Sequence, residues 1–444
     1  MAVSKRAVEH MRQRWASTGL PSGWAFHRIG EVLKRTKHRI ELEDDVEYVQ
    51  PVIRRGHGGI EERDRKYGSE IRTKTQYRLQ TDDWLMSKVQ VLHGAFGIVP
   101  RDLDGAVASS SYFTFSPTQE LLLQYLWYLS HLHQFHETCV LSSVGVDIEK
   151  MVFRVADWKH FEFPLPCRAE QKKIAAILAS VDEAIEATEA VIEQTRRVKK
   201  GLLQELLTRG IGHTEFKKTA IGEIPKGWEV QKLRTLLAEP TRNGYSPVCL
   251  DEETGKWVLG LGALTPDGLD IREIKAAPLD DAKVDSAMLK VGDVLVSRSN
   301  TVERVAYAAI YKGEVENCAY PDLMIRARPD RSRLHPEFLT AHLWTTYARR
   351  YFQGAAAGTS GSMVKITGSV LNNLRVPVPS LEEQREIIGR LESIDSAVGV
   401  NREFLYELQE LKKGLLQDLL TGKVRVNVDE AVGEVEEAVE ALAE

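Results

Sequence analysis

Several groups of side chains contain the residue types of a catalytic site, but their spacing does not fit one. Pro266-Asp267 followed by Glu273 and Lys275 resembles the acidic signature of some metal-dependent nucleases. Only six positions separate the two acids, which is too few for the two strands that would have to present both carboxylates to one metal ion. We therefore do not interpret these residues as a nuclease site.

A cluster of histidines and one cysteine has the donor types of a zinc site. His131 and His133 would point to different faces of a helix, because residues two apart do not share a face. An amphipathic surface helix therefore explains His131, His133, His136 and Cys139 better than a metal does. We expect no metal on this chain.

Nucleotide-binding and methyl-transfer motifs do not occur in the sequence either. GHGG (56–59) and GLGAL (260–264) do not fit G-x-G-x-x-G, and there is no G-x-x-x-x-G-K-[ST] phosphate loop. The Asn-Pro-Pro-Tyr tetrad of adenine methyltransferases is absent as well. The sequence contains no credible catalytic constellation, and it predicts a chain that is not an enzyme.

Basic and polar residues in four loops could instead contact nucleic acid. These loops are 54–77, TRNGYS (241–246), SRSNTVER (297–304) and FQGAAAGTSGSMVKIT (352–367). Arg can pair with guanine and Asn with adenine, while Lys, Ser and Thr reach phosphates. A solvated surface rich in turns would have a similar composition. The candidate DNA-contacting residues are Arg54, Arg55, Lys66, Tyr67, Arg72, Lys74, Lys88, Arg242, Asn243, Tyr245, Arg298, Asn300, Arg304, Ser360 and Lys365.

The strongest pattern in the chain is an internal repeat with an offset of 213 residues. It aligns PLPCRAEQKKIAAILASVDEAIE (164–186) with PVPSLEEQREIIGRLESIDSAVG (377–399). The same offset aligns KKGLLQELLT (199–208) with KKGLLQDLLT (412–421). About 45 residues therefore keep register without a gap, which indicates a duplicated architecture.

Fainter similarities extend the repeat into the rest of each half. PSGW (21–24) resembles PKGW (225–228), and LQTDDWLMSK (79–88) resembles LKVGDVLVSR (289–298). The predicted order is therefore domain, helix, domain, helix.

Each copy of the repeated segment predicts a long helix. Pro-x-Pro favours extended backbone before it, and Glu170 and Glu383 fall near the first turn, where an acid favours the helix dipole. Gly210 and Gly422 are plausible stops. Apolar residues with a 4-3-4-3 spacing predict a coiled-coil seam, with Thr188, Thr195, Lys199, Asn401 and Lys412 at its polar positions. The apolar seam residues are Ile174, Leu178, Val181, Ile185, Ile192, Leu202, Leu206, Ile387, Leu391, Ile394, Val398, Leu405, Leu408, Leu415 and Leu419.

The two predicted helices are each ~58 Å long at 1.5 Å per residue. We expect them to pair with each other in antiparallel orientation and to act as a spacer, although helices that merely dimerise remain an alternative. Gly201 and Gly414 would each cost roughly 1 kcal/mol within a helix. Their repetition predicts either a close backbone approach or tolerated slack.

The globular halves predict a mixed α/β fold. Strand-like runs include 46–53, 88–99 and 293–297, and helical runs include 119–135 and 336–352. The predicted fold class is α+β, with two α/β domains separated by two long helices that form an antiparallel coiled coil with a pseudo-two-fold repeat. The predicted divisions are an N-terminal extension (1–20), a first domain (21–163), a first helix (164–212), a second domain (213–376), a second helix (377–424) and an acidic tail (425–444).

Composition is that of a globular intracellular protein. Of 444 residues, 43% are hydrophobic and 28% charged, and the four cysteines form no C-x-x-C pair. That pattern suits a reducing cytoplasm, and no apolar run reaches the roughly 18 residues of a membrane span. The net charge is −5, but residues 429–444 contain seven acids and no base. The total charge therefore says little about any one surface.

These residues resemble the specificity subunits of type I restriction–modification enzymes. The resemblance rests on P-x-P…EQ…I…IL…D before each helix (164–182 and 377–395). It is reinforced by KKGLLQ, by IGEIPKGWEV (221–230) and by GDVLVSR (292–298). It covers nearly the whole chain after Pro21. Thr81-Asp82-Asp83 departs from the usual Gly-Asp, which leaves Asp83 and Lys88 as the aligned remnant.

The resemblance implies a subunit that recognises DNA without cutting or methylating it. Each half would be a target recognition domain reading one half of a split, asymmetric sequence, and the helices would act as a ruler. Half-sites one turn apart need readers held ~34–36 Å apart, which a ~58 Å helix pair can span. The helices would dock two methyltransferase subunits, and restriction subunits would join them. S-adenosylmethionine, ATP and Mg²⁺ would belong to those partners. The alternative is a structural adaptor without DNA specificity.

Overall fold

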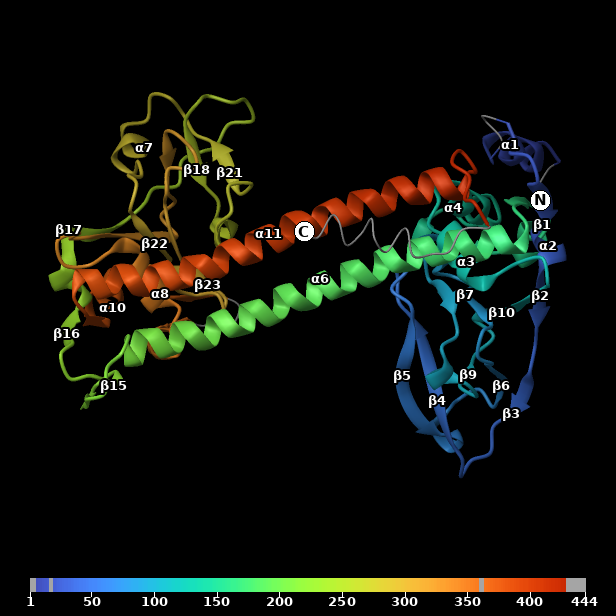
Figure 1. Ribbon diagram of the computed structural model, residues 1–444, viewed down its shortest axis with the longest axis horizontal. Coiled ribbons are helices and arrows are strands. Elements are labelled where there is room, and N and C mark those ends of the chain that lie inside the picture. The colour runs from blue at the N-terminus through green and yellow to red at the C-terminus, as the bar shows by residue number, and fades with distance from the viewer. Residues whose placement is uncertain (1–4, 16–18, 359–362, 429–444) are drawn as a thin grey trace. The chain divides into compact units, whose positions relative to one another are not determined.

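The computed structural model describes residues 5–15, 19–358 and 363–428. The chain divides into two compact units, which we describe separately. Residues up to 190 and from 403 onward form unit 1, and residues 191–402 form unit 2. Two long helices, α6 (Arg168–Arg209) and α11 (Leu381–Leu420), each contribute one half to each unit. They are the green and red helices of Figure 1.

Unit 1 contains a four-stranded antiparallel sheet with the order β2-β10-β7-β8. Its core packs aromatic side chains such as Trp84, Phe115, Phe135 and Trp158 around the start of α6. The N-terminal helix α1 (Lys5–Trp15) covers this core through Met11 and Trp15. The strands of the sheet are β2 (Leu33–Thr36), β10 (Tyr112–Pro117), β7 (Trp84–Ser87) and β8 (Phe96–Ile98).

Further strands extend unit 1 away from that sheet. A long hairpin joins β4 (Glu47–Ile53) to β5 (Ile60–Tyr67). A three-stranded sheet has the order β3-β6-β9 and consists of β3 (Arg39–Glu41), β6 (Thr75–Arg78) and β9 (Val107–Ala108).

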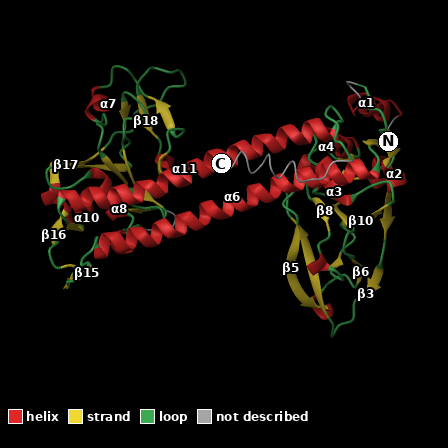
Figure 2. Cartoon of the chain, in the orientation of Figure 1, coloured by secondary structure: helices red, strands yellow, loops and turns green. Residues whose placement is uncertain are grey.

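Unit 2 repeats the strand order of unit 1. Its sheet has the order β17-β26-β22-β24. In both units a short strand pair also precedes the long helix: β1 (Ala25–Arg28) with β13 (Glu162–Leu165), and β16 (Glu229–Lys232) with β28 (Arg375–Val378). The sheet strands of unit 2 are β17 (Leu237–Asn243), β26 (Met324–Pro329), β22 (Val294–Ser297) and β24 (Ala308–Ile310). The mixture of helix and strand in both units (Figure 2) confirms the predicted fold class.

The helical runs predicted at 119–135 and 336–352 are each broken into two helices. The first forms α3 (Leu123–Leu129) and α4 (His133–Leu141). The second forms α8 (Pro336–Leu343) and α9 (Thr346–Ala355), where the Thr345 hydroxyl accepts from the amide of Ala348 and starts a new helix. Side-chain capping of this kind favours a helix start over a continuous helix.

The predicted strand at 88–99 is mostly wrong. Only β8 (Phe96–Ile98) is extended, and residues 91–93 form a 3₁₀ turn. Gly94 ends that turn with a φ of +69°, and a Cβ there would lie 3.2 Å from His57. Glycine relieves both constraints, so the chain turns where apolar composition alone suggested a strand.

The two long helices run antiparallel within each unit. In unit 1, Lys412 pairs with Asp182 at 2.5 Å and Arg425 pairs with Glu170 at 2.7 Å. In unit 2, Lys199 pairs with Asp395, and His213 lies 2.8 Å from Glu383. Every predicted seam position is buried or half-buried, from Ile174 to Leu419.

Both predicted stops end their helices, because Gly210 and Gly422 have φ values of +65° and +71°. A close backbone approach at Gly201 and Gly414 is contradicted within this chain. Both are exposed, and an added Cβ would meet nothing within 4 Å. Among the described helices, none is long and apolar enough to cross a membrane.

Candidate nucleic-acid interface

Strand order in unit 2 brings two of the predicted loops together at one end of neighbouring strands, and we refer to this end as an edge of the sheet. β17 and β22 both pair antiparallel to β26, with Asn243 opposite Ile325 and Ser297 opposite Met324. The ends of β17 and β22 therefore lie on either side of the start of β26. Arg242 and Asn243 on one strand, and Arg298 after the other, are thus brought to the same edge.

A third loop joins this edge through a short strand pair. β23 (Ser299–Asn300) pairs with β27 (Val364–Lys365), which places Ser299 opposite Lys365. The amide of Ile366 also donates to the carbonyl of Arg298 at 2.9 Å. Ser360 lies outside the described residues. Three loops far apart in the sequence therefore meet at one place, which we call the unit 2 edge: residues 241–246, 297–304 and 363–367.

Several cations at the unit 2 edge have no acidic partner. Arg242, Arg304 and Lys365 are exposed and make no ion pair with any described residue. Arg298 is half-buried, and its guanidinium donates to the carbonyl of Asp322 at 3.3 Å. Unpaired cations on an exposed edge can exchange their counterions for phosphate groups, so this arrangement suits nucleic-acid binding.

Two other predicted residues of this edge, Asn300 and Tyr245, make contacts within the domain. The Asn300 side-chain oxygen accepts from the amide of Thr301 at 2.9 Å. Tyr245 is half-buried, and the Lys283 ammonium lies 5.5 Å from its ring centre. These two side chains shape the loops that carry the free cations.

In unit 1 the predicted residues do not gather in one place. Arg54 and Arg55 lie in the turn of the β4–β5 hairpin, whereas Lys66 and Tyr67 lie at the far end of β5. Arg72 and Lys74 lie between that end and β6. At about 3.3 Å per residue, the eight residues of β5 hold the two groups roughly 20–25 Å apart.

Many of the unit 1 candidates are also ion-paired. Arg54 pairs with Glu61 and Arg55 with Glu149, while Lys66 contacts Asp64 at 2.9 Å and Lys74 contacts Asp44. A cation that already has an acidic partner gains less from a phosphate. Arg72 is exposed and makes no ion pair with a described residue.

Lys88 occupies the same backbone environment in unit 1 as Arg298 does in unit 2. The amide of Lys88 donates to the carbonyl of Ser111 at 2.8 Å, and the carbonyl of Lys88 accepts from Phe153 at 2.9 Å. Arg298 makes the matching pair of bonds with Leu323 and Ile366, at 2.7 and 2.9 Å. The alignment of these two cations, drawn from the sequence repeat, is therefore a structural equivalence.

A buried glutamine fastens each domain to the start of its long helix. Gln171 accepts from the amide of Leu122 at 2.8 Å and donates to the carbonyls of Glu120 and Pro166. Both it and its repeat, Gln384, have no exposed surface. This bonding explains the Glu-Gln dipeptide in both copies, which the sequence showed as a pattern without indicating its role.

Gln384 makes the same three bonds in unit 2. It accepts from the amide of His335 at 2.8 Å and donates to the carbonyls of Arg333 and Pro379 at 3.0 and 3.1 Å. The preceding glutamates bind residues that follow the other helix in the chain. Glu170 accepts two hydrogen bonds from the guanidinium of Arg425, and Glu383 accepts from the indole of Trp228 at 2.9 Å.

The residues that resembled catalytic sites have structural contacts instead. Asp267 pairs with Arg196 and Arg402, and His131 stacks on His57 with ring centres 4.1 Å apart. Among the described residues, no group of three or more His, Cys, Asp and Glu side chains is arranged to hold a metal ion.

The molecule therefore consists of a duplicated scaffold in which a long helix follows each domain. The family described as "Type I restriction modification DNA specificity domain" matches residues 21–195 and 225–410. The chain therefore belongs to this family, and its function is DNA target recognition. The resemblance drawn from the sequence is confirmed.

Curated relatives are specificity subunits of type I restriction enzymes. The MjaVIII specificity subunit of Methanocaldococcus jannaschii is 29% identical over 314 residues, covering 68% of this chain and 70% of the relative. The EcoKI specificity subunit of Escherichia coli strain K12 is 27% identical, covering 57% of this chain and 54% of the relative.

Solved structures share the fold. One, from work on complex assembly and conformational transition of the type I R-M system, has a TM-score of 0.59 and 20% identity, covering 91% of this chain and 99% of that one. The type I S subunit from M. genitalium has a TM-score of 0.50 and 14% identity, covering 89% and 96%.

Proposed function

We propose that this chain reads an asymmetric DNA sequence in two parts, with one domain reading each part. The observation that carries the proposal is the unit 2 edge, where three loops bring unpaired cations together on a scaffold that occurs twice. The loops of the two units differ in sequence and in ion pairing. Two identical half-sites are therefore not expected.

We further propose that the chain itself performs no catalysis. It would dock two methyltransferase subunits, with restriction subunits joining the complex, and S-adenosylmethionine, ATP and Mg²⁺ would bind those partners. The duplicated helices support two docking positions for one kind of subunit. The described cysteines Cys139, Cys167, Cys249 and Cys318 are free thiols, which suits the cytoplasm that we propose as its compartment.

Selection from random-sequence DNA tests the proposal. The chain is purified with its methyltransferase partner, and bound DNA is sequenced. We expect enrichment of one motif with two specified parts and an unspecified gap. Uniform binding would instead support the structural adaptor.

A substitution at the unit 2 edge tests whether a residue there recognises one half-site. Arg298→Ala should abolish preference in one half of the motif and leave the other half unchanged. The matched control is Arg272→Ala, because Arg272 is exposed in the same unit but pairs with Asp270 and does not belong to the residues of that edge. Loss of base preference in both halves of the motif, or in neither half, would show that Arg298 does not read a half-site.

A further inference from the structure

A short hairpin of the second domain presents one carboxylate at its tip. β19 (Leu264–Thr265) and β20 (Gly268–Leu269) pair across the two-residue turn Pro266-Asp267. The Thr265 hydroxyl accepts from the amide of Asp267 at 3.3 Å and donates to the carbonyl of Gly268 at 2.8 Å. Leu264 is 5% exposed in the domain core. The position of Asp267 is therefore fixed by the domain itself.

Asp267 contacts both long helices with the same oxygen atom. Its Oδ2 lies 3.1 Å from an Arg196 nitrogen on α6 and 2.5 Å from an Arg402 nitrogen on α11. Because both arginine nitrogens contact the same oxygen, the distance between these two nitrogens cannot exceed the sum of the two contact distances. Without the carboxylate, two like charges would face each other, and the Nε of Arg196 is already buried without a hydrogen-bond partner among the described residues.

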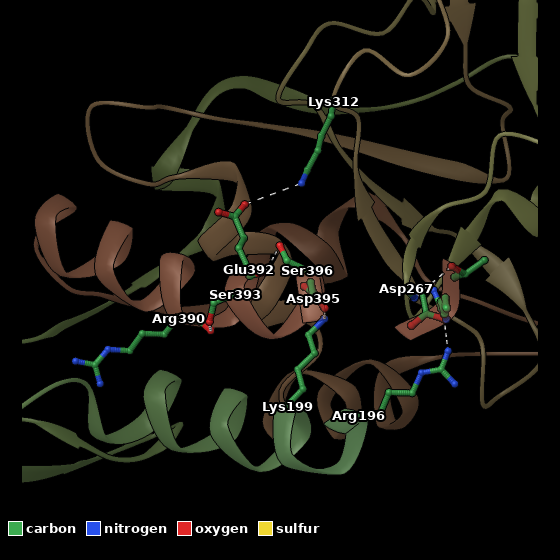
Figure 3. A network of polar contacts seen from close by, with 11 residues as sticks. Arg196, Lys199, Asp267, Lys312, Arg390, Glu392, Ser393, Asp395 and Ser396 are labelled. Atoms are coloured by element: carbon green, nitrogen blue, oxygen red, sulfur yellow. Dashed lines mark hydrogen bonds and ion pairs between the residues drawn. The ribbon is translucent and has the colours of Figure 1, made fainter. Parts of the chain in front are cut away.

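A cavity makes this contact important for the position of the domain. It has a volume of about 780 Å³ and is lined by Leu203 on α6, Leu391 on α11, and Trp344 and Ile310 of the domain. Leu203 and Leu391 belong to an apolar core that the helices share with the domain, but the cavity interrupts that packing here. The polar contacts around the cavity, including Lys199 with Asp395 and Lys312 with Glu392, are drawn in Figure 3.

Among the described residues of unit 1, no equivalent of this contact occurs. The repeat offset of 213 places Gln409 where Arg196 stands and Glu189 where Arg402 stands. Unit 1 instead uses the Tyr128 hydroxyl, which donates to Asp182 at 2.9 Å. Beyond the glutamine bonds that both units share, the two domains therefore make different polar contacts with the long helices.

We propose that Asp267 is a positioning residue that holds the second recognition domain against both helices and so sets the spacing between the two half-sites. Asp267 acts through the hairpin and the helices rather than by reading bases. This inference rests on the proposed two-part reading of DNA.

Selection from random-sequence DNA with the methyltransferase complex tests this role. Wild type should enrich one motif with one gap length. In Asp267→Ala, motifs whose gap differs by one base pair should rise about tenfold relative to wild type, a shift of one decade in relative affinity. The base preferences of both halves should stay unchanged. A triple charge exchange, Asp267→Lys with Arg196→Glu and Arg402→Glu, should restore the single gap length.

The matched control is Asp270→Asn in the same part of the domain, because the one ion pair of Asp270 with a described residue is with Arg272, two positions further along the chain. Backbone hydrogen exchange over 264–269 adds a readout without DNA, and it should speed up in Asp267→Ala but not in the control. A single gap length in both variants would overturn the positioning role while leaving two-part reading intact. Absence of any gapped motif with wild type would overturn both.

Discussion

At the scale of single residues, the glutamine of the repeated Glu-Gln dipeptide is the clearest link between sequence and stability. Gln384 is fully buried. Its side-chain amide forms hydrogen bonds with one backbone N–H group and with two backbone carbonyls. Its replacement leaves those backbone groups without partners. Buried groups that lose a hydrogen-bond partner cost about 1–3 kcal/mol each.

Gln384→Ala should therefore lower the free energy of unfolding of unit 2 by about 2–4 kcal/mol, a large effect for one substitution. Denaturant unfolding followed by tryptophan fluorescence measures it. Gln409→Ala is the control, because Gln409 is exposed on the same helix. An equal, small effect of both substitutions would mean that the buried bonds contribute little.

His342 gives unit 2 a pH dependence. Burial lowers the pKa of His342 to about 4 from an ordinary value of 6.5, and its Nε2 donates to the carbonyl of Arg375 at 3.0 Å. The unfolded chain binds a proton at higher pH than the folded chain does. The contribution of His342 to the free energy of unfolding is therefore fully present above about pH 6.5, and it is lost as the pH falls toward 4.

We expect unit 2 to lose ~2 kcal/mol between pH 7.5 and pH 5 through this group. His342→Gln removes the titration but keeps an N–H donor for the carbonyl, so it should flatten the curve over that range. Unfolding at several pH values measures it, with His10→Gln on the exposed face of α1 as control. Parallel curves for wild type and His342→Gln would contradict this assignment.

At the scale of elements, the repeat predicted what both copies share. The seam, the stops at Gly210 and Gly422 and the equivalence of Lys88 with Arg298 all follow from one offset. The contact of Asp267 with Arg196 and Arg402 could not be predicted, because neither arginine recurs in the other copy. The meeting of three loops at the unit 2 edge also required the strand order, which long-range pairing decides and local patterns do not.

Two exposed helical glycines provide a test at the same scale. Gly201→Ala and Gly414→Ala should each raise the free energy of unfolding by about 1 kcal/mol, because alanine favours the helix and its Cβ meets nothing in this chain. Thermal melting of the single variants and of the double variant measures the gain.

Gly210→Ala is the contrasting variant. Gly210 has a positive φ, and a Cβ there would lie 2.6 Å from the Glu383 carboxylate. This substitution should destabilise, because both the backbone and the space require glycine. A loss of stability in Gly201→Ala would instead reveal a constraint within the chain at that position.

At the scale of the whole molecule, charge is distributed in a way that the net value of −5 hides. The unit 2 edge carries cations without acidic partners, whereas most candidate cations of unit 1 are neutralised by neighbouring acids. The two domains should therefore contribute unequally to binding, even though their sheets share one strand order. Salt dependence can separate these contributions, because each phosphate contact releases counterions.

The logarithm of DNA affinity should fall linearly with the logarithm of salt concentration, with a slope of about −0.9 for each phosphate contacted. Arg304→Ala and Lys365→Ala should each make the slope shallower by about 0.9 and leave the selected motif unchanged, because these exposed side chains have no ion pair to replace. Arg54→Ala should change it much less, since Arg54 already pairs with Glu61. Titrations of the methyltransferase complex at several salt concentrations measure all three slopes. Equal changes for paired and unpaired cations would show that ion pairing within the free chain does not decide which residues meet the DNA.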